Sequence, residues 1–273
     1  MNPFCRLPPW RGVRHSRPLL LLVLVVACAP ALHPIPEHPQ ADPDLLLGRM
    51  HARQAGLDTI SAVGRAESRT RDGTFRGRVT VLADKAGRIR VDAWTSTDVL
   101  VAFIGAGPDG FTYFQRGNPE CLVGPTCQSN LGRFLPQGWD LTSLAHALMG
   151  IAPLRPVIHP WRLSFDRRVG AYLLQSSFED AEVQRLWLRE DGTALAYERS
   201  LAGNVLLRLE IAEPATTPGL PARKIIMKGG AGDSELAIRY QDIETNPQMD
   251  PGDWTVDCPE SNKIRVMPCE GEP

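Results

Sequence analysis

The stretch FRGRVTVLADKAGRIRVDAW, residues 75–94, indicates the fold class of this chain. On both sides of the turn at residues 85–87, apolar or small side chains mostly alternate with charged or polar ones. Two is the side-chain period of a strand, so the stretch predicts an antiparallel hairpin with one dry and one wet face. The larger apolar side chains of the dry face are Phe75, Val79, Val81, Ile89 and Val91.

Strand-like runs recur along the rest of the chain, and turns that contain Gly, Asp or Asn separate them. They lie at residues 60–69, 99–105, 111–116, 161–167, 171–178, 183–189, 194–201, 205–212, 223–228 and 235–243. About 11–12 strands joined by short turns predict an antiparallel sheet that hides its edges by curling. The expected fold is therefore mainly β, a curved half-open barrel.

Two segments have helix signals. The first begins at Asp42-Pro43, where an N-cap aspartate precedes a first-turn proline, and it ends at Gly56. The second is capped by Asp140 and ends at Gly150, with Leu141, Leu144 and Leu148 on one apolar face. We expect both helices to pack on the concave face of the curved sheet.

The N-terminus has the layout of a secretory leader. Four arginines and no acidic residue precede the apolar run Leu19–Val26, and Val25-Val26-Ala27-Cys28 follows. This tetrapeptide resembles the lipobox of bacterial lipoproteins. The resemblance implies a signal peptide at residues 1–27 and acylation of Cys28, which would anchor the chain in a membrane. An ordinary leader cut after Ala29 and an uncleaved anchor are the alternatives.

Residues 28–43 predict a tether. Five prolines in this segment favour extended polyproline II, which acts as a semi-rigid spacer. His33 and His38 are interpreted as solvated linker residues and not as metal ligands. Ala29 stands where an inner-membrane retention signal often has Asp, so the lipobox resemblance favours the periplasmic side of the outer membrane. Residues 44–273 have the length of one all-β domain.

Four cysteines remain in the predicted domain, at positions 121, 127, 258 and 269. In an oxidising periplasm they predict two disulfides. Three connectivities are open, and we favour the local one, Cys121 with Cys127 and Cys258 with Cys269. Zinc coordination is disfavoured because neither pair has the tight spacing of zinc-binding motifs.

Charge and motifs argue against several functions. The net charge of −1 and the absence of a basic run exclude a nucleic-acid partner. Gly105-Ala-Gly-Pro-Asp-Gly110 spells a dinucleotide fingerprint, but strand-forming residues follow it where a helix is required, so we interpret it as a hairpin turn. His146 and His159 have no nucleophile to serve. We expect neither an enzyme nor a cofactor or metal.

The lipobox, the leading helix, the strand that begins at Ile60, the 75–94 hairpin and the inserted 144–150 helix together resemble the LolA/LolB superfamily. In that family an open half-barrel is lidded by helices around a cavity that takes acyl chains. The resemblance implies a cavity lined by Phe75, Val79, Val81, Ile89, Val91, Leu141, Leu144 and Leu148. The resemblance also implies that the protein attaches to the membrane through its N-terminal acyl chains. It further implies that the protein binds the acyl chains of lipids or lipoproteins. A LolB-like protruding loop could be sought in residues 99–104, but a buried strand is the preferred interpretation.

A second function from a different class stays open. The chain could be an accessory or scaffold lipoprotein that contacts another envelope protein and has a filled core without a ligand. The difference between the two functions lies in the interior, because a carrier needs an apolar cavity of several hundred Å³.

Overall fold

One continuous sheet dominates the computed structural model, which describes residues 32–70, 73–134, 138–230 and 234–269. The strands are β1 (Thr59–Thr70), β2 (Gly73–Asp84), β3 (Ile89–Trp94), β4 (Leu100–Gly107), β5 (Gly110–Gln115), β6 (Glu120–Gly124), β7 (Arg162–Asp166), β8 (Ala171–Ser177), β9 (Glu182–Leu188), β10 (Ala194–Leu201), β11 (Asn204–Glu213), β12 (Lys224–Gly229), β13 (Ser234–Thr245) and β14 (Lys263–Val266). The helices are α1 (Pro43–Gln54), α2 (Gln128–Leu131), α3 (Leu141–Leu148) and the 3₁₀ helix η2 (Pro251–Trp254).

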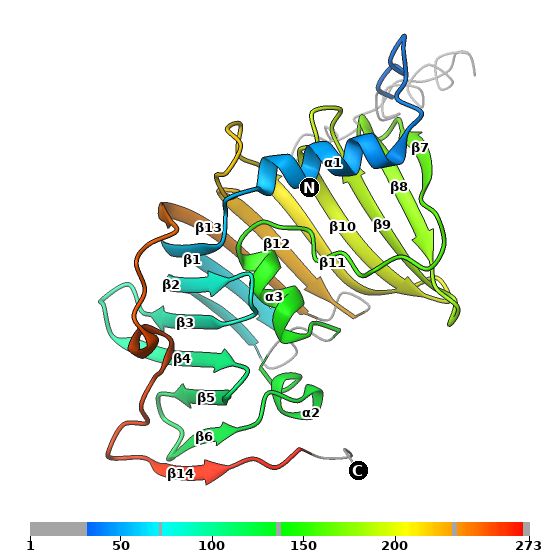
Figure 1. The fold of residues 1–273 in the computed structure, drawn as a ribbon. Helices are drawn as coiled ribbons and strands as arrows, with labels where there is room; N and C mark the ends of the chain where they lie inside the picture. The colour runs from blue at the N-terminus through cyan, green and yellow to red at the C-terminus, as the bar shows by residue number, and fades with distance from the viewer. Residues whose placement is uncertain (1–31, 71–72, 135–137, 231–233, 270–273) are drawn as a thin grey trace, which may run out of the picture.

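The strand order is β14-β6-β5-β4-β3-β2-β1-β13-β12-β11-β10-β9-β8-β7, and β14 and β7 are the two free edges. All neighbouring strands are antiparallel except β14 and β6. The sheet curves around α1 and α3, which lie on its concave face (Figure 1). The predicted mainly β, half-open barrel is confirmed. The described residues form 14 strands, whereas the sequence predicted about 11–12.

The hairpin of residues 75–94 forms as predicted. Its register pairs Ala83 with Ile89 and Val79 with Ala93, which places the apolar residues of both strands on the concave face. The turn is closed by Asp84, whose carboxylate accepts hydrogen bonds from the backbone N–H of Arg88 at 2.8 Å and from its Nε at 2.6 Å. The sequence pattern therefore set both the strands and the face that they bury.

Both predicted helices are present, and each begins where its cap was expected. The Asp42 side chain accepts a hydrogen bond from the N–H of Asp44 at 2.9 Å, and Pro43 occupies the first turn of α1. Leu46 and Met50 point from α1 into the core and are almost fully buried. Among the described helices, none combines the length and the apolar character needed to cross a membrane.

The glycine-rich segment before β5 is a hairpin turn, as the sequence analysis concluded. Gly107 pairs with Gly110 in a tight connection between β4 and β5, and a strand follows where a nucleotide-binding loop needs a helix. Residues 100–104 of the apolar run lie within β4, between β3 and β5, so the strand interpretation is confirmed for them. The segment around η2 covers the other face of β4, where a Cβ at Gly105 would lie 3.1 Å from the carbonyl oxygen of Trp254.

The signal peptide and Cys28 lie outside the described residues, so the leader and the anchor stay predictions. The described part of the tether contacts the domain at two points. The backbone of His33 makes two hydrogen bonds with Arg167. Its N–H donates to the Arg167 carbonyl oxygen at 2.8 Å, and its carbonyl oxygen accepts from Arg167 Nε at 3.1 Å. The N–H of Gln40 donates to the hydroxyl of Tyr172 at 3.0 Å. These contacts lay the segment along the β7–β8 end of the sheet.

The predicted disulfide pairing is wrong, although all four cysteines are bridged. Cys121 is joined to Cys258, and Cys127 is joined to Cys269. The cause is the parallel pairing of β14 with β6, which runs from Lys263–Glu120 to Val266–Val123. Because the two segments run parallel, the first cysteine of one, Cys121, meets the first of the other, Cys258, and Cys127 likewise meets Cys269. The local pairing would need each segment to fold back on itself.

The two bridges hold a strand that has little burial of its own. All four residues of β14 are exposed, and Ile264 and Val266 are 65% and 70% accessible. A disulfide stabilises a fold mainly by restricting the unfolded chain, more so when the closed loop is long. The separations of 137 and 142 residues therefore make these bridges the principal attachment of the C-terminal segment.

Non-reducing peptide mapping should link Cys121 to Cys258 and Cys127 to Cys269. Because the second bridge still ties the two segments together, Cys258→Ala should lower the free energy of unfolding by about 3 kcal/mol, which denaturant titration measures. Cys121→Ala is the matched control: it should cost the same, and the double variant should add almost nothing further. A peptide that joins Cys121 to Cys127 would overturn the pairing.

Candidate functional site

Helix α3 lies over the concave face and gathers the residues that the sequence analysis assigned to a ligand cavity. Val79, Val81, Ile89, Leu144 and Leu148 are at most 3% accessible. Phe75, Val91 and Leu141 are partly buried against the same hydrophobic cluster. The eight predicted residues come from β2, β3 and α3, and all of them lie in or pack against the main hydrophobic core, to which most other strands and α1 also contribute.

Local sequence determines where α3 begins and ends. Asp140 is its N-cap and accepts from the N–H of Ser143 at 2.7 Å and from the Ser143 hydroxyl at 2.8 Å. After the helix, Gly150 adopts φ +72°, a conformation that ends helices and that other residues rarely adopt. An isolated helix of eight residues is unstable in water, so α3 depends on its contacts with the sheet.

Two buried hydrogen bonds attach α3 and its flanking residues to the sheet. The hydroxyl of Tyr240 in β13 donates to the carbonyl oxygen of Leu148 at 2.8 Å. The indole Nε1 of Trp139, which is fully buried, donates to the carbonyl oxygen of Lys228 at 3.2 Å. Burial raises the pKa of Tyr240 far above its ordinary value, so the phenol stays a proton donor at neutral pH.

His146 lies on the outer side of α3, where it contacts the turn between β2 and β3. Its Nε2 is 3.3 Å from the carbonyl oxygen of Lys85, in the turn between β2 and β3. Burial lowers the pKa of His146 below its ordinary value and outweighs the opposing effects of that hydrogen bond and of Asp140. The ring is therefore neutral at pH 7. His159, the other histidine considered, lies elsewhere, and its carbonyl accepts from the Ser176 hydroxyl at 2.8 Å.

The sequence analysis missed a buried polar cluster on the concave face of β9 and β10. Glu182 is 5% accessible and pairs with Arg199 at 2.5 Å and Arg155 at 2.8 Å. Gln184 accepts from the Tyr197 hydroxyl at 3.2 Å and donates to the Arg155 carbonyl at 3.1 Å. Burial alone raises the pKa of Glu182, but the two guanidinium groups outweigh it and hold the pKa below its ordinary value. The carboxylate is thus a charged partner that fixes the chain after α3. The sequence did contain a signal for this cluster: Glu182 and Gln184 occupy positions of β9 that face the core together with Leu186 and Leu188.

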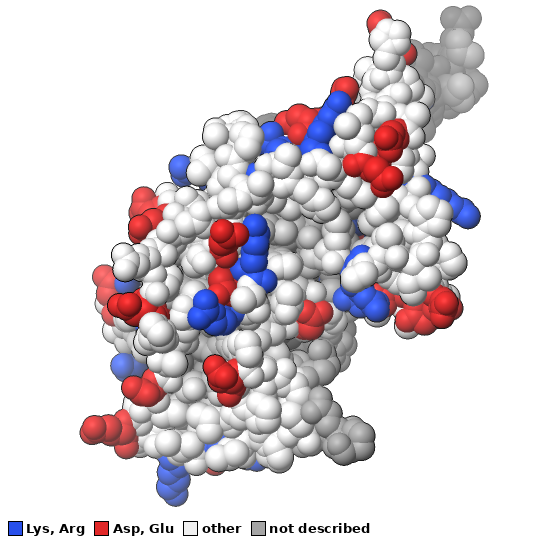
Figure 2. All heavy atoms as spheres, viewed as in Figure 1, with Lys and Arg blue, Asp and Glu red and all other residues white. Residues whose placement is uncertain are grey.

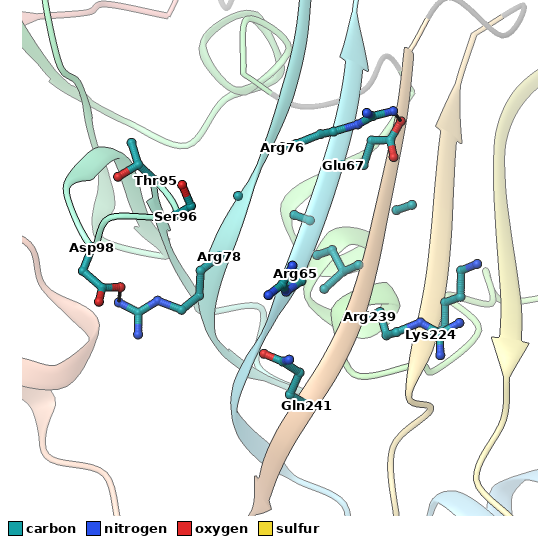
Figure 3. A pocket seen from close by; sticks show the side chains of 14 residues that line it. Arg65, Glu67, Arg76, Arg78, Thr95, Ser96, Asp98, Lys224, Arg239 and Gln241 are labelled. Atoms are coloured by element: carbon teal, nitrogen blue, oxygen red, sulfur yellow. Dashed lines mark hydrogen bonds and ion pairs between the residues drawn. The ribbon is translucent and has the colours of Figure 1, made fainter.

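The space between α3 and the sheet is filled by side chains. Among the hollows of the described residues, three have volumes of about 550, 350 and 50 Å³, and none of these three is lined by the eight predicted residues. The second lies beside His159 and Gln175, and the smallest lies near the end of α1. The largest lies on the opposite, convex face (Figure 3). An acyl chain can therefore enter the predicted site only if α3 moves.

The surface on the helix side is not strongly charged. Lysine, arginine, aspartate and glutamate lie there in small groups, with uncharged surface between them (Figure 2). Within the described part of the chain, no group of three or more His, Cys, Asp or Glu side chains could hold a metal ion.

Solved structures share this fold. A DUF1329 family protein from Desulfovibrio piger aligns with a TM-score of 0.53, at 11% identity over 78% of this chain and 95% of its own. A domain assigned to outer-membrane lipoprotein sorting, from Vibrio parahaemolyticus, aligns with 0.50, at 11% identity over 77% and 94%. A LolA superfamily protein from Nitrosomonas europaea aligns with 0.45, at 11% over 78% and 97%.

No protein-family model and no curated protein sequence matches the chain. At 11% identity the structural likenesses concern the fold alone, and the first two carry the argument. The protein is a half-open β-barrel with helices on its concave face. This mainly β, half-open barrel is the fold class that the sequence predicted, and the Desulfovibrio piger and Vibrio parahaemolyticus structures share it.

Tyr240→Phe tests how α3 is held. The variant leaves the buried Leu148 carbonyl without its donor, which should cost about 1–2 kcal/mol of stability and speed amide hydrogen exchange in residues 141–149. Tyr113→Phe is the matched control, because its hydroxyl donates to the exposed Gln115 at 3.0 Å. Unchanged exchange in residues 141–149, or equal effects of the two substitutions, would show that this hydrogen bond does not hold the helix.

Proposed function

We propose that this chain handles lipids or lipoproteins in the bacterial envelope and holds an acyl chain between the concave face and α3. The observation that carries the proposal is the single apolar cluster beneath a short helix. That cluster contains all eight residues assigned to the cavity. The described structure corresponds in this proposal to the closed, unloaded form, and the protein acts by binding, without catalysis.

The construction of α3 supports its role as a lid. The helix has eight residues, its flanking Gly138 and Gly150 both have positive φ, and its packing partners are mainly β2 and β12. Elements that move in function come from the less stable part of a structure. When α3 lifts, the side chains that it covers form an apolar surface along β2 and β3, and a hydrocarbon chain can replace the helix there.

The fold supports the same class of function. The Vibrio parahaemolyticus domain that shares it is assigned to outer-membrane lipoprotein sorting. The lipobox-like tetrapeptide that ends at Cys28 supports a location of this chain in the bacterial envelope. We therefore propose a lipid-anchored protein on the periplasmic side of the outer membrane.

The filled interior favours a second function. With Val81 and Ile89 fully buried and Leu148 1% accessible, the domain can also be a scaffold or accessory lipoprotein with a permanent core. In that function α3 is simply part of the core, and an envelope protein binds elsewhere on the surface. Ligand binding separates the two functions directly.

A fluorescent fatty acid should bind the chain that begins after Cys28 at micromolar concentration, as measured by fluorescence titration. Leu148→Glu should abolish binding, because the carboxylate would stand where the acyl chain packs. Leu45→Glu is the matched control: Leu45 is 44% accessible on α1, so the same substitution should leave binding unchanged.

The fold should tolerate Leu148→Glu better than Val79→Asp, because a charge in the sheet disrupts the core whereas a charged lid can swing out. Thermal denaturation measures that difference. If the unaltered protein binds no acyl probe at micromolar concentration, the carrier function is rejected and the scaffold function takes its place.

The anchor has its own test. Cys28→Ala should move the protein from the membrane fraction to soluble or unprocessed material, since three acyl chains hold a protein at the membrane far longer than one. Cell fractionation with mass spectrometry of the N-terminus measures both location and processing. Unchanged membrane partition with the leader removed contradicts acylation.

A further inference from the structure

A hollow of about 550 Å³ lies on the convex face, over β1, β2, β12 and β13 and beside the turn at residues 95–98 (Figure 3). Side chains alternate along a strand. Ala62 and Ala66 of β1 belong to the core, so Arg65 between them faces away from the helices. The hollow therefore lies across the sheet from the proposed acyl site.

Four cations stand side by side in this hollow. In the sheet register, Arg78 of β2 pairs with Arg65 of β1, Arg65 pairs with Arg239 of β13, and Arg239 pairs with Lys224 of β12. We call these four residues the cationic row. Neighbouring strands are about 4.8 Å apart, and like charges directly opposite each other are destabilising. The sheet thus places four positive charges where each repels the next.

Carboxylates neutralise two alternate members of the row, Arg78 at one end and Arg239 in the interior. Arg78 pairs with Asp98 at 2.9 Å, and Arg239 pairs with Glu213 at 2.5 Å. Nearby, Arg76 pairs with Glu67 at 2.9 Å (Figure 3). Among the described residues, neither Arg65 nor Lys224 has an ion pair or a side-chain hydrogen bond. The hollow therefore holds two unpaired positive charges, Arg65 between the two paired arginines and Lys224 at the far end of the row.

The same face shows what a neutralised arrangement looks like. A second row crosses β9, β10, β11, β12, β13 and β1, and we call it the paired row: Arg185, Glu198, Arg208, Lys228, Glu235 and Arg69. Its members form ion pairs with each other or with Glu210 and Glu67. Lys228 and Arg69 follow Lys224 and Arg65 by four residues on the same strands and the same face. Unlike the paired row, the cationic row has no carboxylate among its own members, and two of its four cations have no ion pair.

We propose that the hollow binds a phosphate-bearing anionic group, with Arg65 and Lys224 supplying the free charges and Arg78 and Arg239 lying on either side of Arg65. Guanidinium groups match the geometry of phosphate oxygens with two parallel hydrogen bonds, and a lysine adds a point charge. The hollow has the volume of a small-ligand site. Its floor contains Ala237, whose short side chain leaves that volume open.

One nitrogen atom beside the hollow has no hydrogen-bond acceptor within the described structure. The Nε of Arg78 is shielded from solvent and donates no hydrogen bond within the described structure. Shielded donors without a partner are uncommon in proteins, and here the guanidinium lies over the ring of Trp94, 5.4 Å from its centroid. The group bound here can be the phosphate of a lipid headgroup or free phosphate. The proposal does not depend on acyl-chain binding, because the two sites lie on opposite faces.

The test measures binding by isothermal titration calorimetry at low ionic strength, with the full mature chain in non-ionic detergent. The probes are inorganic phosphate, short-chain phosphatidylglycerol and, as the headgroup without net charge, short-chain phosphatidylcholine. Each cation near an anionic group contributes about five-fold in affinity, so Arg65→Gln with Lys224→Gln should weaken binding on the order of 25-fold. The matched control, Arg69→Gln with Lys228→Gln, removes equal charge from the paired row and should change affinity less than about two-fold.

Thermal denaturation of the same variants gives a second readout. Arg65→Gln should leave the melting temperature unchanged or raise it, because it removes repulsion within the row, whereas Arg69→Gln should not raise it. If inorganic phosphate binds and its binding depends on Arg65 and Lys224, the phosphate group alone is sufficient for recognition. If phosphatidylglycerol binds and inorganic phosphate does not, the ligand is a lipid headgroup. Equal losses in both double variants, or no binding of either anionic probe, would overturn the proposal.

Discussion

One sheet with fourteen strands among the described residues has to cover its apolar concave face with very little helix. The helices that lie on that face, α1 and α3, have twelve and eight residues. The centre of the core is therefore covered by one short element, α3, whose position depends on Tyr240, Trp139 and its own apolar side chains. The cover of the core is thus also its least self-sufficient part, which is why a lid and a permanent core are the two functions to separate.

The two faces of the sheet have different chemistry because side chains alternate along every strand. In β1, Ala62 and Ala66 contribute to the core while Arg65 contributes to a cationic hollow on the other side. A register slip of one residue would exchange the two faces, so the pairing that buries the core also aligns the cations. An apolar site and a phosphate site can therefore coexist without sharing a residue, one on each face of the same strands.

Strand β14 in the C-terminal segment is held by covalent bonds more than by burial of its own side chains, although Met267 directly after it is buried in the core. Strand β14 is exposed along its length and extends the sheet only as a parallel edge beside β6. Cys121–Cys258 and Cys127–Cys269 join it to the sheet at both ends of that pairing. An edge strand with exposed Ile264 and Val266 is prone to separate or to pair elsewhere, and the two bridges prevent that. The fold in this form therefore requires an oxidising compartment.

Local features could be predicted from the sequence alone. The alternation in residues 75–94 defined a hairpin and its buried face, and Asp42 and Asp140 marked the starts of two helices, because strand period and helix caps involve residues close in the chain. The eight cavity residues came from the same local patterns and from the resemblance they support. The disulfide pairing, the Glu182 cluster and the row of Arg78, Arg65, Arg239 and Lys224 were decided by the tertiary structure. Each depends on the register between strands far apart in the chain, and that register follows from burying the whole concave face at once.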